Sequence, residues 1–255
     1  MIQAVSACGD CFAVTVINRA RFSTRFTVSP QLDRREVISL LGFASAVLSF
    51  GCGSDAAGNP TSPEGTTAAS TNASCAVTPT ETIGPYPSHE SLIRGDIREG
   101  KSGTPLALTI TVVSSSNSCG AVAGASVGIW QCDAAGNYSE YGTQTAQTYL
   151  RGIQTTDVNG QVTFTTIYPG WYQGRATHIH VEVVRNGSSV KVTQIAFPES
   201  MNAAVYATSA YASRGSNPTA NSADDIFRDS VGSELASVSG DPASALTATF
   251  TVAIA

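Results

Sequence analysis

The segment GWYQGRATHIHVEV, residues 170–183, carries the strongest structural signal in the chain. From Thr177 to Val183 polar and apolar residues alternate, and this period of two is typical of a strand with one buried face. Because side chains two apart in a strand point to the same side, His178 and His180 should project together. The apolar residues between and after them should pack into a core on the other side. Two neighbouring imidazoles are a natural pair of metal ligands.

The chain as a whole is poor in charge and rich in strand-forming residues. Only 13% of its 255 residues are charged, against about 25% in an average soluble domain. The formal net charge is -5, and Lys101 and Lys191 are the only lysines. Nucleic-acid binding needs a concentrated positive surface, and no basic cluster follows the first 35 residues. No nucleic-acid partner is therefore expected.

Residues 1–52 have the pattern of an export signal. Arg34 and Arg35 precede an apolar stretch at 37–48, and small residues then lead to Cys52. A basic flank, a short apolar core and small residues in this order are typical of such signals, and the paired arginines resemble a twin-arginine signal. Cys52 resembles a bacterial lipoprotein acylation site, which would give the protein a lipid anchor. A buried helix is the alternative interpretation of the apolar stretch.

Residues 53–74 are small and polar, cannot build a core, and should form a flexible linker. The folded domain then begins near Cys75 and comprises residues 75–255. We expect the protein to be exported, as a periplasmic, extracellular or lipid-anchored cell-surface protein. A disulfide persists in such a compartment. The domain has three cysteines, so it can form one bridge at most, from any pair of Cys75, Cys119 and Cys132.

Short strand-like runs separated by tight turns fill the domain. Asn159 and Gly160 form a strong hairpin signal. The one good helical stretch is short, at 199–207, and the polar region 209–239 should be a long surface loop. Many short strands with almost no helix predict an all-β fold, an antiparallel β-sandwich with long loops and little helix. The expected strands are 106–113, 126–132, 161–167, 177–184, 190–197 and 246–254.

Three segments of the domain resemble, in the same order, motifs of the intradiol ring-cleavage dioxygenases. Residues 129–139 (IWQCDAAGNYS) are similar to the first ligand motif of that family, and residues 166–180 (TIYPGWYQGRATHIH) to the second. Residues 78–86 (TPTETIGPY) resemble the segment that opens the domain and reaches the substrate pocket. The resemblance spans roughly residues 75–197. It marks as substrate-binding candidates Gly84, Pro85 and Tyr86.

The resemblance implies one non-haem Fe(III) per chain, held by two tyrosines and two histidines. Carried over position by position, the ligands are Tyr138, Tyr172, His178 and His180. The donor chemistry agrees with this, because Fe(III) is a hard ion that prefers anionic oxygen, and a phenol ionises near neutral pH only beside such a charge. Two phenolates and two neutral imidazoles leave a net charge of about +1 at the centre. That charge suits a catecholate dianion.

The implied activity is that of an oxidoreductase acting on a catechol-type aromatic and O2. Both oxygen atoms would be inserted between the two hydroxylated carbons, giving a muconate-type product. Tyr172, the axial ligand by correspondence, would also act as general base, and Arg175 would stabilise the anionic substrate by a charge-assisted hydrogen bond. The loop from Tyr172 to His178 is shorter than in the soluble catechol and protocatechuate enzymes. This reduces one pocket wall and resembles the exported branch of the family.

Two alternatives account for part of the pattern. An exported β-sandwich that serves as a surface or binding module would carry a non-catalytic site. Alternatively, His178 and His180 would hold copper or zinc. The presence of all four ligand types in order favours the dioxygenase. Colour separates the possibilities, because tyrosinate-to-Fe(III) charge transfer makes a loaded protein red-brown, whereas a zinc-bound or empty protein is colourless.

Overall fold

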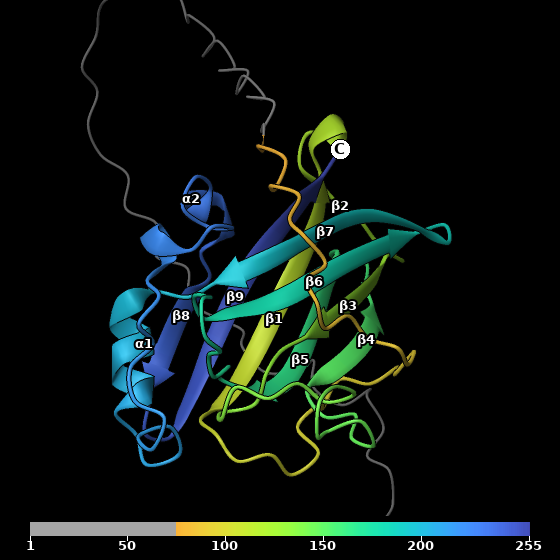
Figure 1. Ribbon diagram of the computed structural model, residues 1–255. Helices are drawn as coiled ribbons and strands as arrows, with labels where there is room; N and C mark the ends of the chain where they lie inside the picture. The colour runs from red at the N-terminus through yellow and green to blue at the C-terminus, as the bar shows by residue number, and fades with distance from the viewer. Residues whose placement is uncertain (1–74) are drawn as a thin grey trace, which may run out of the picture. The chain divides into compact units, whose positions relative to one another are not determined.

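Two β-sheets packed face to face make up the part of the chain that the structure describes (Figure 1). The computed structural model describes residues 75–255, so the expected export signal, the linker and Cys52 lie outside the described residues. One sheet has the order β4-β3-β6-β7, and the other has the order β2-β1-β9-β8 with β5 also paired to β1. The strands are β1 (Pro105–Ser114), β2 (Gly120–Ala121), β3 (Ser126–Trp130), β4 (Arg151–Thr155), β5 (Gln161–Ile167), β6 (His178–Arg185), β7 (Ser188–Ala196), β8 (Ser237–Asp241) and β9 (Ala245–Ile254).

The core lies between the sheets because the long strands alternate buried and exposed side chains. Every second residue of β1 and of β9 is buried. From the other sheet, Ile179, Val181 and Val183 of β6 are fully buried in the same core. Each such aliphatic side chain contributes about 1.5–3 kcal/mol on burial. This packing holds β6 with His178 and His180 on the opposite face, as the alternation predicts.

The predicted all-β sandwich is confirmed, with one departure from a purely antiparallel arrangement. β1 and β9 run parallel, with Leu106 opposite Leu246. A parallel pair needs a long connection, and nearly the whole domain lies between these two strands. The six expected strands form within two residues of their predicted ends, and the expected helix is α1 (Glu199–Tyr206). The region 209–239 is not loop throughout, because α2 (Val231–Glu234) and the start of β8 lie in it.

The hairpin predicted at Asn159 and Gly160 is wrong, although the turn itself forms. Gly160 has a φ of +72°, and the Asp157 N–H donates to the Gln161 carbonyl at 3.0 Å. The turn joins two strands that separate, however, since β4 pairs with β3 in one sheet and β5 pairs with β1 in the other. A turn sequence fixes only its local backbone, and the packing of the apolar faces decides which strands pair.

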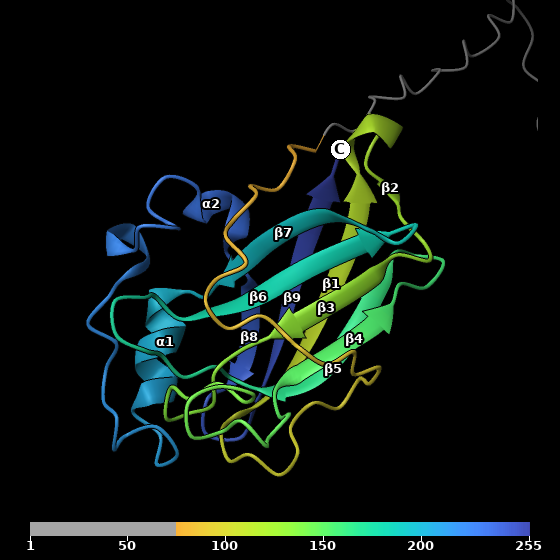
Figure 2. The same cartoon turned by 45° about the vertical axis from the view of Figure 1, so that its right-hand side comes forward.

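An N-terminal strap, residues 75–90, lies along the outer face of the β4-β3-β6-β7 sheet. Figure 2 shows it, in orange, crossing β7 and β6. The Glu81 N–H donates to the Val192 carbonyl of β7 at 2.9 Å. Further along the strap, Gly84 lies directly against His180 of β6. The strap therefore carries the predicted substrate-binding residues onto the face from which the histidines project.

The structure selects one of the three cysteine pairs that the sequence left open. Cys75, at the start of the strap, is bridged to Cys119, with their Cα atoms 5.7 Å apart. Cys132 is a buried free thiol. Burial raises its pKa to about 12, so it stays protonated and unreactive. Within residues 75–255 the structure contains no helix with the length and apolar character needed to cross a membrane.

Candidate metal centre

The two histidines open strand β6 with their rings side by side. The ring centroids of His178 and His180 are 4.8 Å apart, and both side chains are buried. The Nδ1 atom of His178 lies 2.6 Å from the Ala176 carbonyl oxygen. Because a carbonyl only accepts hydrogen bonds, Nδ1 carries the proton, and Nε2 keeps its lone pair. A backbone partner that fixes the tautomer in this way is typical of histidines that bind metals.

Tyr138 reaches the histidines from the loop that follows β3. The Asp133 carboxylate accepts the N–H groups of Ala135 and Asn137 and shapes this loop. Gly136, between these two residues, has a φ of +87°, and a Cβ there would collide with the carbonyl oxygen of Trp171. The missing side chain thus lets the Tyr138 loop touch the turn that carries Tyr172.

The structure brings all four predicted ligands into one cluster. The Tyr138 hydroxyl lies 3.4 Å from Nε2 of His178, and the ring centroids of Tyr138 and Tyr172 are 5.8 Å apart. The Tyr172 ring is 5.5 Å from that of His178, and the Tyr138 ring is 6.4 Å from that of His180. Tyr138 is buried, whereas Tyr172 is partly open to solvent.

Burial sets the protonation states of this cluster. It lowers the pKa of His178 to about 3, with a further contribution from the nearby Arg175 charge. It also places the pKa of His180 well below the usual value. Both imidazoles are therefore neutral at physiological pH, which is the form that binds metals. Burial raises the pKa of Tyr138 and of Tyr172, so the phenols stay protonated until a cation lowers that pKa.

A metal ion fits this donor set. Both ring nitrogens of His180 are buried and have no hydrogen-bond partner, and such orphaned groups cost about 1–3 kcal/mol each. The Trp130 ring stacks on the His180 ring, with the ring centroids 4.9 Å apart. Coordination would satisfy one His180 nitrogen. Between residues 75 and 255 no group of three or more His, Cys, Asp or Glu side chains could hold a metal. The candidate centre differs from such groups because two of its four donors are tyrosines.

Arg175 lies beside Tyr172, where it was expected to act. Its Nη1 donates to the Tyr172 hydroxyl at 3.5 Å. Its Nη2 donates to Oε1 of Gln194 at 2.6 Å, and its Nε donates to Oδ2 of Asp224 at 2.8 Å. The guanidinium is thus held on two sides, and its remaining edge faces a predicted ligand.

Sequence reasoning missed Asp224 and Gln194. Asp224 is fully buried and also accepts the Ala176 N–H. Burial alone would raise its pKa, but the hydrogen bonds from Ala176 and Arg175 outweigh that effect and hold the pKa below its usual value. Asp224 lies in the region expected to be a surface loop, so no local pattern marks it. Gln194 is the cross-strand neighbour of His180, a signal that appears only once the strand register is known.

The strap places two of its three predicted substrate-binding residues against the ligands. Gly84 has a φ of +74°, and a Cβ on it would lie 2.8 Å from Cε1 of His180. The Tyr86 ring stacks on Tyr138 at 4.6 Å and meets the edge of Tyr172 at 5.8 Å. Pro85, between them, is exposed.

Known proteins resemble this chain in both sequence and fold. A protein-family model described as "Dioxygenase" matches residues 83–214. An intradiol ring-cleavage dioxygenase from Tetranychus urticae is 32% identical, covers 71% of this chain and 95% of its own, and superposes with a TM-score of 0.63. The chain belongs to the intradiol ring-cleavage dioxygenase family. This dioxygenase therefore belongs to a family of oxidoreductases.

Other solved structures share the fold of the dioxygenase. The dioxygenase domain of a dioxygenase carbohydrate-binding protein fusion from Streptomyces sp. SirexAA-E is 29% identical, covers 70% of this chain and 97% of its own, and has a TM-score of 0.54. The 3-chlorocatechol 1,2-dioxygenase from Rhodococcus opacus 1CP is 20% identical, covers 69% of this chain and 72% of its own, and has a TM-score of 0.52. At that identity it shows the fold alone. No curated protein matches the chain.

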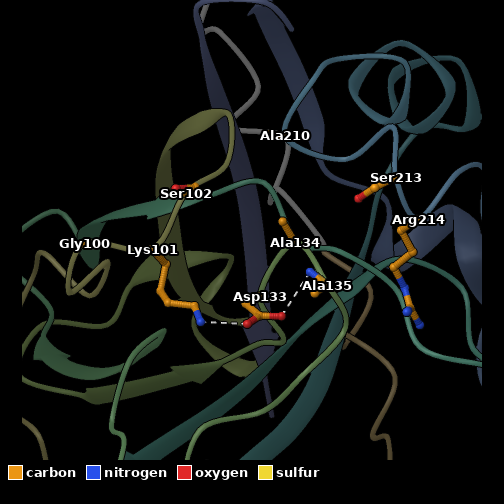
Figure 3. A pocket seen from close by; sticks show the side chains of 9 residues that line it. All are labelled: Gly100, Lys101, Ser102, Asp133, Ala134, Ala135, Ala210, Ser213 and Arg214. Carbon is orange, nitrogen blue, oxygen red and sulfur yellow. Dashed lines mark hydrogen bonds and ion pairs between the residues drawn. The ribbon is translucent and has the colours of Figure 1, made fainter.

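Two cavities of the dioxygenase differ in their relation to the ligands. A cavity of about 530 Å³ contains none of the four ligands, and in Figure 3 Lys101 and Asp133 point toward one another along its wall. The two form an ion pair at 2.7 Å. A smaller cavity of about 140 Å³ adjoins the candidate centre, because Tyr86 and Tyr138 line it together with Tyr141. The smaller cavity is the one that could extend a substrate pocket.

Proposed function

We propose that this dioxygenase binds one Fe(III) through Tyr138, Tyr172, His178 and His180 and cleaves a catechol-type ring between its two hydroxylated carbons. One observation carries the proposal: four donor side chains converge, three of them are buried, and the ring nitrogens of His180 have no hydrogen-bond partner. Bound Fe(III) would supply a Lewis-acidic, redox-active centre that holds the catechol oxygens and makes the ring reactive toward O2. Two phenolates favour the ferric ion over copper or zinc.

The two tyrosines are suited to different roles. Tyr138 is buried, so its oxygen is best suited to stay in place throughout turnover. Tyr172 is partly exposed, and its hydroxyl receives a hydrogen bond from Arg175. Tyr172 can therefore accept the proton that the catechol loses, as a general base in contact with the substrate. The Arg175 charge stabilises the oxyanion that forms on the substrate beside it.

The substrate class follows from the pocket wall. By the family resemblance, the short loop between Tyr172 and His178 would build less of one pocket wall than the longer loop of the soluble enzymes does. The cavity of about 140 Å³ beside Tyr138 is lined by aromatic and small polar residues. We therefore propose that ring-substituted catechols are accepted as well as catechol itself. A substituent would extend along Tyr86 and Tyr141.

Oxygen uptake across a panel of catechols tests the proposal. The protein is purified without added metal, its iron content is measured, and each product is identified by mass and ultraviolet spectrum. We expect about one iron per chain, a red-brown colour and muconate-type products. A yellow semialdehyde product would mean extradiol cleavage and would overturn the mechanism. A preparation that stays colourless after reconstitution with iron would overturn the metal assignment.

We also propose that the dioxygenase is exported and works outside the cytoplasm. The disulfide between Cys75 and Cys119 supports this, because such bonds persist in oxidising compartments. The acylation of Cys52 stays a prediction, which labelled fatty-acid incorporation in the wild type and in Cys52→Ala would test. Label in neither protein would exclude the lipid anchor.

A further inference from the structure

The larger of the two cavities, with a volume of about 530 Å³, has the size of a small-molecule site. Its wall carries charged side chains and hydroxyl groups, and alanine is the largest apolar residue among the described residues that line it. Figure 3 shows Lys101 and Arg214 on either side of Ala134 and Ala135. A lining of this kind offers little to an aromatic ring, but it suits a compact polar molecule.

The charge of Lys101 is matched within the protein. Its Nζ forms the ion pair with the Asp133 carboxylate at 2.7 Å and lies 3.8 Å from the centre of the Tyr149 ring. The same carboxylate accepts the N–H groups of Ala135 at 3.0 Å and of Asn137 at 2.9 Å. The pair therefore adds no net charge to the cavity, although Lys101 can still donate to a ligand hydroxyl, since an ammonium group has three donors.

Arg214 supplies a charge that no described carboxylate matches, because every ion pair between residues 75 and 255 is formed by another cation. Its Nε donates to the Trp171 carbonyl at 2.7 Å, and its guanidinium carbon lies 4.2 Å from the centre of the Trp171 ring. The two Nη groups make no hydrogen bond to any described residue. A guanidinium held in this way presents two parallel donors, which match the two oxygens of a carboxylate.

Two serine hydroxyls complete the polar wall. Ser102 and Ser213 both line the cavity, and both are at exposed positions. Each hydroxyl can donate one hydrogen bond and accept others, so each can pair with a hydroxyl group of a ligand. A molecule with one carboxylate and several hydroxyl groups would therefore find a partner for each kind of polar group that it carries.

We propose that this cavity binds a small hydroxylated monocarboxylate, such as a sugar acid, whose carboxylate pairs with Arg214. Two cations and one carboxylate line the cavity, and this excess of one positive charge suits a single anionic group. None of the four candidate iron ligands lines the cavity, so the proposal is independent of the proposed function. The Trp171 ring, which lies against the Arg214 guanidinium, provides a reporter, because a ligand on Arg214 changes the surroundings of the indole.

The probe is D-glucuronate, with D-glucose and acetate as matched controls, because glucose lacks the carboxylate and acetate lacks the hydroxyl groups. Binding to the full chain is measured by isothermal titration calorimetry and by tryptophan fluorescence. We expect D-glucuronate to bind with a Kd of about 1 mM or lower, and both controls to bind at least about tenfold more weakly. The absence of any signal up to about 10 mM D-glucuronate would overturn the proposal. Equal affinity for glucose or for acetate would also overturn it.

A pair of arginine variants tests whether the carboxylate meets Arg214. Arg214→Gln should bind D-glucuronate at least about tenfold more weakly, because the charge and the pair of donors are both lost. Arg228→Gln is the matched control, since Arg228 is exposed, pairs with Asp225 at 2.8 Å and does not line the cavity. It removes the same charge from the protein and should bind like the wild type. Unchanged affinity in Arg214→Gln, or an equal loss in Arg228→Gln, would overturn the proposal.

Ala210 offers a second test that leaves Arg214 in place. It lines the cavity at an exposed position, so the fold should tolerate a longer polar side chain there. Ala210→Glu would put a carboxylate of the protein into the cavity, compete for Arg214 and remove most D-glucuronate binding. Ala210→Gln has the same shape without the charge and should bind much like the wild type. Should Arg214→Gln fail to fold, this pair decides, and wild-type affinity in Ala210→Glu would overturn the proposal.

Discussion

Gly84 offers the sharpest perturbation of the candidate centre, because one methyl group should act on one ligand. In Gly84→Ala the new Cβ would lie 2.8 Å from Cε1 of His180, whereas ordinary contacts begin near 3.4 Å. The ring or the strap must therefore shift by about 0.6 Å. The positive φ adds strain of about 1 kcal/mol for any residue with a Cβ. We expect roughly that loss of stability and Fe(III) binding weakened about tenfold, which is about 1.4 kcal/mol.

A matched control separates the strain from the contact. Gly100 has a φ of +75°, almost the same as Gly84, but a Cβ there would meet nothing within 4 Å. Gly100→Ala should therefore lose about 1 kcal/mol of stability and bind Fe(III) like the wild type. Urea unfolding of the metal-free proteins measures the first quantity. Titration with Fe(III), followed by the visible band and by quenching of tryptophan fluorescence, measures the second. Equal iron affinities in the two alanine variants would refute the reasoning.

Four further predictions concern Tyr172, Arg175, the start of the folded domain and the pH dependence of stability. Tyr172→Phe should abolish most turnover and shift the visible band, because a ligand and a base are both lost. Arg175→Ala should keep iron and colour but slow the chemical step. An iron-free Arg175→Ala would contradict the placement of Arg175 outside the ligand set. A chain that starts at Ser74 should be soluble, folded and able to bind iron, and its insolubility beside a soluble full-length protein would show that the earlier residues belong to the fold. In the folded protein the pKa of His178 is about 3, whereas in the unfolded chain it is near the usual 6.5. Below pH 6.5 only the unfolded chain takes up a proton at this residue. The metal-free protein should therefore lose stability as pH falls from 6.5 toward 3. We expect a loss of about 3 kcal/mol by pH 4 that is missing in His178→Gln, and parallel urea-unfolding curves for the two proteins across this range would contradict it.

The sequence by itself determined the strand that carries the histidines and the identity of the candidate ligands. The alternation from Thr177 to Val183 places His178 and His180 on one face, because side-chain direction in a strand is a local property. The candidate tyrosine ligands, Tyr138 and Tyr172, came instead from the resemblance of the motifs around them to those of the family. The export signal and the linker remain predictions, since they lie outside the described residues.

The tertiary structure alone decided which distant groups meet these ligands. Asp224 reaches Arg175 from a region expected to be a surface loop, and Arg151 joins Ser139 to the strap. The Asn159 turn formed, yet the strands on either side of it went to different sheets. A turn or a strand is specified by neighbouring residues, whereas the pairing of strands and the partner of a buried charge depend on how apolar faces pack across the whole domain.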